Sequence, residues 1–223
     1  MAATFTKDRF MSGCCDHDSG LTFEGKDNAY KWTLVFVIGL NALMFFVEMA
    51  AGFNATSQAL KADALDFLGD SLTYGLTLAV IGMSLRVRAT AAMFKGISLL
   101  LMGVAVLGMT TYRVFVLGVP NEITMGVIGI LALAANVISV MALWRYKDGD
   151  SNVHSVWLCS RNDAVGNVII ILAAVAVGAT QSRWPDLAVA TIMAGLFLHS
   201  STLIIRQSRE ELDRAKRLTS VEG

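Results

Sequence analysis

Two pairs of potential metal-binding residues occur at the same spacing within apolar stretches of the sequence. Asp66 and Asp70 are four residues apart, and so are Cys159 and Asp163. Side chains four residues apart lie on the same face of a helix, so each pair could hold one ion between them. Together the two pairs supply four ligands, the number that a tetrahedral divalent metal site requires. The sequence therefore predicts a transition-metal site formed by these four residues.

The apolar surroundings of the acids argue for a function. A carboxylate at membrane depth costs on the order of 2.5–3.5 kcal/mol on insertion scales, and Asp63 adds a third to the same block. In the alternative interpretation, the acids pair with bases such as Lys61 or Arg161, or are protonated in a cavity. Because a chelating pair occurs twice, we favour metal binding for Asp66 and Asp70. Asp63 is predicted to lie beside the ligands or to line the cavity.

Other polar residues could support this site. Asn41 and Glu48 are seven residues apart in an apolar block and would share one helix face, and Asn167 follows the Cys159–Asp163 pair. We expect Asn41, Glu48 and Asn167 to line the cavity. The alternative for Asn41 and Glu48 is an interhelical hydrogen bond and a protonated or paired acid.

Soft metal ligands also occur near the N-terminus, where Cys14, Cys15 and His17 form part of the run Cys-Cys-Asp-His-Asp. On a flexible tail, they could capture a metal ion and pass it inward. Their spacing is not that of a structural zinc site, so the alternative is an inert tail.

The composition identifies the elements that must position these residues. The 223 residues are 55% hydrophobic and only 16% charged, and soluble chains contain about a quarter charged residues. The zero net charge gives no electrostatic reason to expect nucleic acid as a partner. Apolar blocks of roughly the 20 residues that cross a bilayer as a helix lie at about 32–53, 58–82, 93–117, 121–144, 153–179 and 184–206. The sequence predicts an all-α integral membrane protein of six transmembrane helices.

Basic residues predict how this bundle is oriented. They gather before the first block, after the second, fourth and sixth blocks, and are sparse elsewhere. The positive-inside rule then places both termini in the cytoplasm. We divide the chain into a tail (1–30), a six-helix domain (31–206) and a short tail (207–223), with a helix over 207–219 extending the last span. Spans two and five run in opposite directions, which would set Asp66 level with Asp163 and Asp70 level with Cys159.

The first two predicted helices resemble those of the cation diffusion facilitator family. The family pattern has Asn and Glu on helix one, then Gly, Ser-x-Ala-Leu, Asp-Ala and a His/Asp-xxx-Asp site. The matching residues here are Asn41, Glu48, Gly52, Ser57, Ala59, Leu60, Asp63, Ala64, Asp66 and Asp70. Cys159 and Asp163 occupy the place of the second such site, on helix five, and the resemblance covers residues 30–206.

Two departures from the family pattern have consequences. Cys159 stands where the family usually has His or Asp, so the resemblance does not fix the metal. Many members also carry a cytoplasmic domain after helix six, whereas this chain ends soon after its last span. We therefore expect a short form of the family whose dimerisation rests on the transmembrane helices.

The resemblance implies efflux of a divalent metal from the cytoplasm by alternating access, with protons moving the other way, in a homodimer of the bacterial inner membrane. Three carboxylates and a thiolate suit Zn²⁺, and sulfur favours Cd²⁺. Co²⁺, Fe²⁺ and Mn²⁺ remain alternatives, whereas Mg²⁺ and Ca²⁺ prefer more oxygen ligands. No cofactor is expected besides the transported ion.

The sequence leaves two other functions as alternatives. One is a carrier of organic cations, which should show aromatic residues and an isolated acid; the other is a membrane protein that binds or senses metal without transporting it. An enzyme is disfavoured, because the sequence shows no Ser/His/Asp or nucleotide-binding arrangement.

Overall fold

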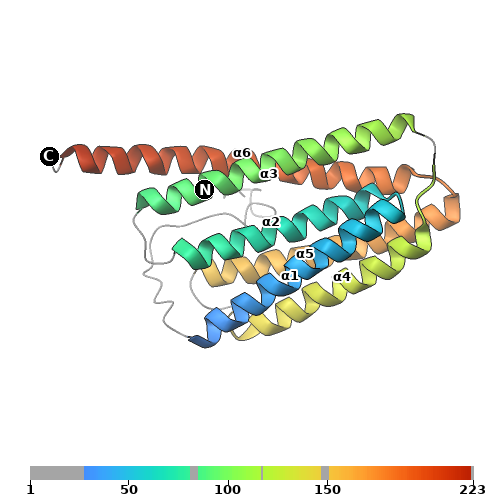
Figure 1. Ribbon diagram of the computed structural model, residues 1–223, viewed down its shortest axis with the longest axis horizontal. Helices are drawn as coiled ribbons and strands as arrows, with labels where there is room; N and C mark the ends of the chain where they lie inside the picture. Colours follow the sequence, from blue (N-terminus) through green and yellow to red (C-terminus); the bar gives the residue numbers. More distant parts are fainter. Residues whose placement is uncertain (1–27, 81–84, 117, 147–150, 222–223) are drawn as a thin grey trace, which may run out of the picture.

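The computed structural model describes residues 28–80, 85–116, 118–146 and 151–221, which form six long α-helices (Figure 1). The prediction of an all-α fold is confirmed, and the described residues contain no strand. The helices are α1 (Asn28–Asn54), α2 (Gln58–Val80), α3 (Leu85–Phe115), α4 (Glu122–Leu143), α5 (Ser151–Thr180) and α6 (Trp184–Val221), with a short 3-10 turn, η1 (Trp144–Tyr146), after α4. Helix α6 includes the predicted extension over 207–219.

Local sequence signals explain where the helices begin and end. Between α3 and α4, Gly118 has a φ of 149°, which favours glycine over any residue with a Cβ. Asn121 then caps α4, its side chain accepting a hydrogen bond of 2.8 Å from the Thr124 N–H. Pro185 follows the first residue of α6, near a helix start, where the N–H that proline lacks has no intrahelical partner.

Five of the helices (α1, α3, α4, α5 and α6) are long and apolar enough to cross a membrane. Helix α2 differs because it contains four charged residues: Lys61, Asp63, Asp66 and Asp70. It lies inside the bundle, and every residue from 57 to 64 is buried. The helices on the outside present large apolar side chains such as Phe46, Leu101 and Leu172. This polarity, with charge inside and apolar residues outside, is the one that a bilayer requires.

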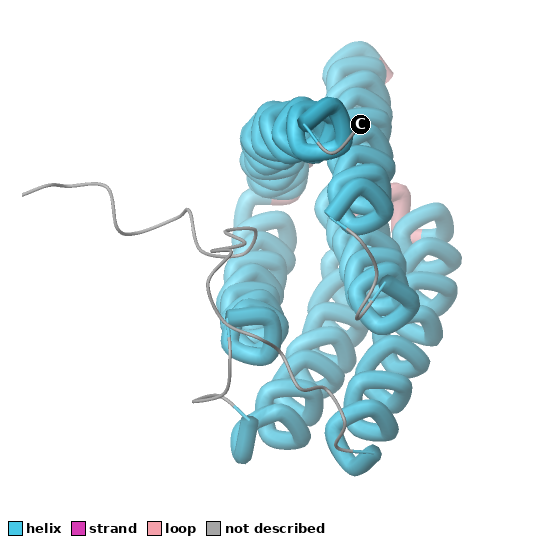
Figure 2. Tube along the Cα trace, turned by 90° about the vertical axis from the view of Figure 1, so that its left-hand side faces the viewer, coloured by secondary structure: helices cyan, strands magenta, loops and turns pink. Residues whose placement is uncertain are grey.

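The helices form two groups. Helices α3 and α6 pack together along much of their length, at the top of Figure 1, while α1, α2, α4 and α5 form a four-helix group below them. Small residues permit the close approach, since a Cβ added at Gly96 or Gly103 of α3 would lie 2.8 or 3.0 Å from α6 side chains. Figure 2 shows the same bundle from the end at which α6 finishes.

The two ends of the bundle differ in what they contain. Helix α1 begins and α6 ends at one end, which we call the terminal end (left in Figure 1). The connections at 55–57, 118–121 and 181–183 lie at the other, which we call the turn end. An even number of antiparallel helices produces this arrangement. Which end faces the cytoplasm stays a prediction.

Candidate metal centre

Helices α2 and α5 bring together two of the predicted ligands. The Asp70 carboxyl on α2 lies in hydrogen-bonding contact with the Asp163 carboxyl on α5, and both side chains are half-buried. Asp70 is twelve residues from the start of α2, a distance of about 18 Å at 1.5 Å per residue. Two acids that are 93 positions apart in the sequence therefore meet deep inside the bundle.

A tyrosine that the sequence analysis did not select completes this contact. Tyr74 is almost fully buried, and its hydroxyl donates a hydrogen bond of 2.6 Å to Asp70 Oδ2. Cys159 and Asp163 are also among its electrostatic neighbours. The signal was present in the sequence, because Tyr74 is one helical turn beyond Asp70 and is the next member of the series that begins with Asp66.

The alignment of α2 against α5 differs from the expected one. We expected Asp70 level with Cys159, but its hydrogen-bonding contact is with Asp163. Tyr74 is the α2 residue that we find beside Cys159, which corresponds to a shift of about one turn. The limits of the apolar blocks indicate only the approximate depth of a residue in the membrane. They do not fix the axial position of one packed helix relative to another.

Asp66 lies one turn from Asp70, toward the turn end, close to a second group of acids. Glu48 on α1 and Asp63 on α2 face each other, and Asp66 is an electrostatic neighbour of Glu48. Glu48 and Asp63 are 0% and 2% exposed. Among the described residues, neither Glu48 oxygen nor Asp63 Oδ2 has a hydrogen-bond partner of good geometry. Neighbouring carboxylates that are buried and charged repel one another, so this group would attract a cation.

Asn41 and Asn167 also lie in the interior. Both side chains are almost completely buried, and their amide groups make no hydrogen bond within the described part of the chain. Buried polar groups are normally hydrogen-bonded. Asn41, on α1, and Asn167, on α5, thus add uncommitted donors and acceptors to the inside of the four-helix group.

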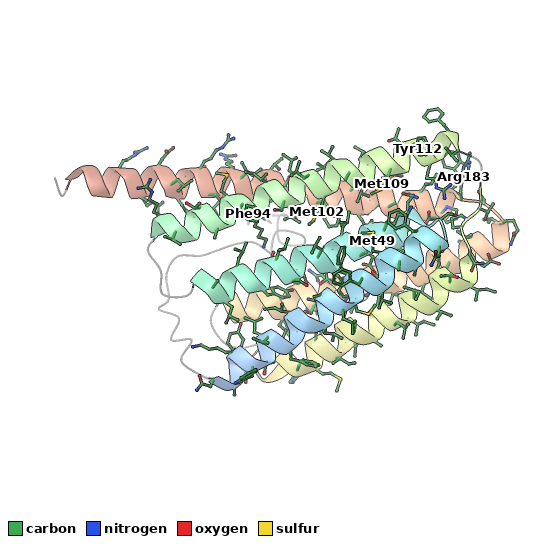
Figure 3. All side chains as sticks on the ribbon, in the orientation of Figure 1. Met49, Phe94, Met102, Met109, Tyr112 and Arg183 are labelled. Atoms are coloured by element: carbon green, nitrogen blue, oxygen red, sulfur yellow. The ribbon has the colours of Figure 1, made fainter. Side chains whose placement is uncertain are left out.

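The basic residues considered as partners of the acids have other neighbours. Lys61 Nζ stacks on the Phe53 ring, 4.5 Å from its centroid, and the acid that interacts with it electrostatically is Asp186. The Arg161 guanidinium lies 5.3 Å from the centroid of a Trp157 ring. The cation near Asp70 is Lys95 of α3, which lines a small groove between α2 and α3 with Phe94 and Met102 (Figure 3).

The structure places the four predicted ligands on adjacent turns of two neighbouring helices, but not in one coordination shell. In residues 28–80, 85–116, 118–146 and 151–221, no three Cys, His, Asp or Glu side chains are close enough together to hold an ion. Side chains, or α2 against α5, would have to shift for an ion to be held. Cys14, Cys15 and His17 lie outside the described residues.

Known proteins match most of the length of this chain. Residues 34–212 match the family model of the cation efflux transmembrane domain. The chain is 28% identical over 192 residues to the metal cation efflux system protein CzcD of Cupriavidus metallidurans, covering 79% of this chain and 59% of that protein. It is 24% identical over 195 residues to the zinc transporter ZitB of Escherichia coli, covering 80% of this chain and 61% of that protein.

A third relative is named a cadmium, cobalt and zinc/H(+)-K(+) antiporter, from Bacillus velezensis. The identity is 26% over 197 residues, covering 80% of this chain and 61% of the relative. The chain thus spans about three-fifths of the length of these curated relatives. The matched family domain includes most of α1 and all of α2 to α5, the helices that carry the acids and Cys159. The chain is therefore a multi-pass membrane protein that belongs to the cation diffusion facilitator family of cation efflux proteins.

Proposed function

We propose that this chain exports divalent transition-metal ions, Zn²⁺ first and Cd²⁺ with it, in exchange for protons by alternating access. The observation that carries the proposal is the contact between Asp70 and Asp163 inside a membrane bundle. The family match and relatives named for metal efflux, zinc transport and antiport support it.

The chemistry of the site accounts for the exchange. Two carboxyls in contact cannot both be ionised cheaply, so Asp70 and Asp163 share a proton when no metal is bound. A divalent ion that enters must displace this proton and, if Cys159 binds, the thiol proton as well. Movement of adjacent turns brings Asp66 and Cys159 to the ion. Once the bundle opens to the other side, incoming protons compete for the carboxylates and release the metal.

The identity of the metal depends on Cys159. A thiolate favours Cd²⁺ and Zn²⁺ over harder ions, whereas the carboxylates accept most divalent metals. Co²⁺, Fe²⁺ and Mn²⁺ are alternative substrates of the same site. The proposal requires no cofactor besides the transported ion.

The proposed assembly is a homodimer through the transmembrane helices in the inner membrane of a bacterium. The named relatives are bacterial. The outer helix faces are apolar, so they can face either lipid or a second copy.

Flux measured in vesicles tests the proposal. The purified chain is reconstituted into liposomes that contain a metal-sensitive dye and, in parallel, a pH-sensitive dye. An inward Zn²⁺ or Cd²⁺ gradient should drive metal in and protons out, whereas Mg²⁺ should drive neither. Metal binding without flux would instead support a membrane metal-binding or sensing protein, and metal flux without proton counterflow would refute exchange.

The same assay tests the metal assignment. Cys159→Ser should slow Cd²⁺ flux more than Zn²⁺ flux, because the thiolate is the soft ligand of the set. The double variant Cys14→Ser/Cys15→Ser measures separately what the N-terminal thiols contribute to the flux of each metal. Equal slowing of both metals would refute the role of Cys159 in selectivity.

A further inference from the structure

The turn end of the bundle contains a buried carboxylate that the metal site does not use. Asp186, in the first turn of α6, is 1% exposed. Its Oδ1 accepts hydrogen bonds from Ser57 Oγ (2.5 Å) and the Ala59 N–H (3.0 Å), and its Oδ2 accepts one from the Gln58 N–H (2.8 Å). The first N–H groups of a helix have no partner within it. Asp186 therefore caps the N-terminus of α2 from another helix.

Two arginines join the other connections at this end. Arg113, in the last turn of α3, donates a hydrogen bond of 3.2 Å to the Thr56 carbonyl, between α1 and α2. Arg183, just before α6, donates to the carbonyls of Val116 (2.7 Å) and Val114 (3.0 Å) at the end of α3; Figure 3 shows its position at the turn end. We call Asp186, Ser57, Arg113 and Arg183 the turn-end latch.

The backbone beside the latch is strained. Thr56 has a φ of 57°, a left-handed conformation that a β-branched residue rarely adopts and that costs about 1–3 kcal/mol. The latch bonds the Thr56 carbonyl and the three residues that follow it. Thr56 can therefore relax when the latch opens, so the closed state of this turn depends on the latch.

The latch connects the two groups of helices. Asp186 and Arg113 belong to the α3–α6 pair, whereas Ser57 and the start of α2 belong to the four-helix group. Asp66 is eight residues from the start of α2, about 12 Å at 1.5 Å per residue. With the latch formed, the bundle is fastened at the turn end, and hydrogen bonds hold the α3–α6 pair against the start of α2.

We propose that Asp186 is a positioning residue for transport, which holds the bundle closed at the turn end and whose release from α2 opens the site to that side. This inference rests on the proposed transport function for its role, but not for its test. Asp186 touches no metal in this account. It acts through α2, by setting whether Cys159 can be reached from the turn end or the terminal end.

The accessibility of Cys159 provides the test. The chain has three cysteines, so Cys14→Ser/Cys15→Ser leaves Cys159 alone. In vesicles without metal, a membrane-impermeant maleimide is applied to one face and then to the other. Asp186→Asn should disrupt the latch, because the new amide N–H₂ faces a backbone N–H donor whichever carboxylate oxygen it replaces. Because hydrogen bonds to a charged group are stronger than those between neutral groups, their loss should open the turn end more often. We expect Cys159 to be labelled roughly tenfold faster from the turn-end face and more slowly from the terminal-end face.

Two further variants make the outcome decisive. Ser57→Ala keeps both hydrogen bonds that Asp186 accepts from backbone N–H groups and should show a smaller shift in the same direction. It provides the test if Asp186→Asn fails to fold. Glu122→Gln, in the first turn of α4 at the same end, should label like the parent. If labelling from both faces is unchanged in folded Asp186→Asn or Ser57→Ala protein, the latch is only a structural brace and the proposal is wrong. Absence of metal flux in the parent would sink the proposed function and leave this result standing.

Discussion

The position of the Asp70 carboxylate is set by partners on two helices. The Tyr74 hydroxyl holds one of its oxygens, and Asp163 approaches from α5. Ligands in metal sites are commonly oriented by such outer hydrogen bonds, whose loss typically costs 10–100-fold in affinity. Tyr74 would thus orient the Asp70 carboxylate without itself binding the ion.

Removal of the Tyr74 hydroxyl tests this role. Tyr74→Phe keeps the ring that packs among Tyr30, Leu34 and Leu143 but removes the bond to Asp70. We expect the affinity for Zn²⁺, measured by titration calorimetry on purified protein, to fall roughly tenfold. The thermal unfolding temperature should change little. Tyr112→Phe, at an exposed position of α3, is the control. An unchanged Kd in Tyr74→Phe would show that the hydroxyl does not orient a ligand.

Side chains differed in how well their roles could be predicted from sequence. Asp70 and Asp163 were found because a carboxylate inside an apolar block is costly and therefore conspicuous. Tyr74 was not, since an aromatic residue in such a block costs little and is expected as packing. Asp186 was overlooked for another reason: it stands at the edge of a span, where an acid is expected to be solvated at the start of a helix.

Among the elements, the α3–α6 pair is held together by close backbone approach. Gly96 faces Ile204 and Ile205, and Gly103 faces Phe197 and Leu198. Sequence alone does not identify α6 as the partner of α3, because a small residue indicates that some helix can come close but not which helix. The axial shift of α2 against α5 was not predicted either, because the spacing of ligands within each helix does not give the axial position of one helix relative to the other.

Alanine at two glycines of α3 should have opposite effects. A Cβ at Gly96 would meet Ile205 Cγ1 at 2.8 Å, whereas one at Gly108 would meet nothing within 4 Å. Overpacking costs about 1–3 kcal/mol, and alanine gains about 1 kcal/mol over glycine in a helix. Gly96→Ala should therefore lower the thermal unfolding temperature in detergent, and Gly108→Ala should leave it unchanged or raise it. The same shift in both would contradict the packing described for α3 and α6.

For the molecule as a whole, composition was sufficient to predict six helices in a membrane. Helix α2 shows why charge alone does not exclude a span, since its charged stretch is enclosed by neighbouring helices. The division into an α3–α6 pair and a four-helix group depends on contacts between distant segments and could not be derived from block lengths. In this account the division matters for transport: α2 and α5 hold the ligands, and the latch joins α2 to α3 and α6.

The initial rate of Zn²⁺ transport into liposomes by Asp70→Asn and Asp163→Asn tests whether this pair of carboxyls binds the transported metal. Each change removes one charge from the pair of carboxyls in contact across α2 and α5. Asp213→Asn, at an exposed position near the end of α6, controls for loss of an acid outside the site. We predict that both site variants assemble normally but transport at the rate of empty liposomes, while Asp213→Asn matches the parent. A parental rate in either Asp70→Asn or Asp163→Asn would show that this pair of carboxyls does not bind the transported metal.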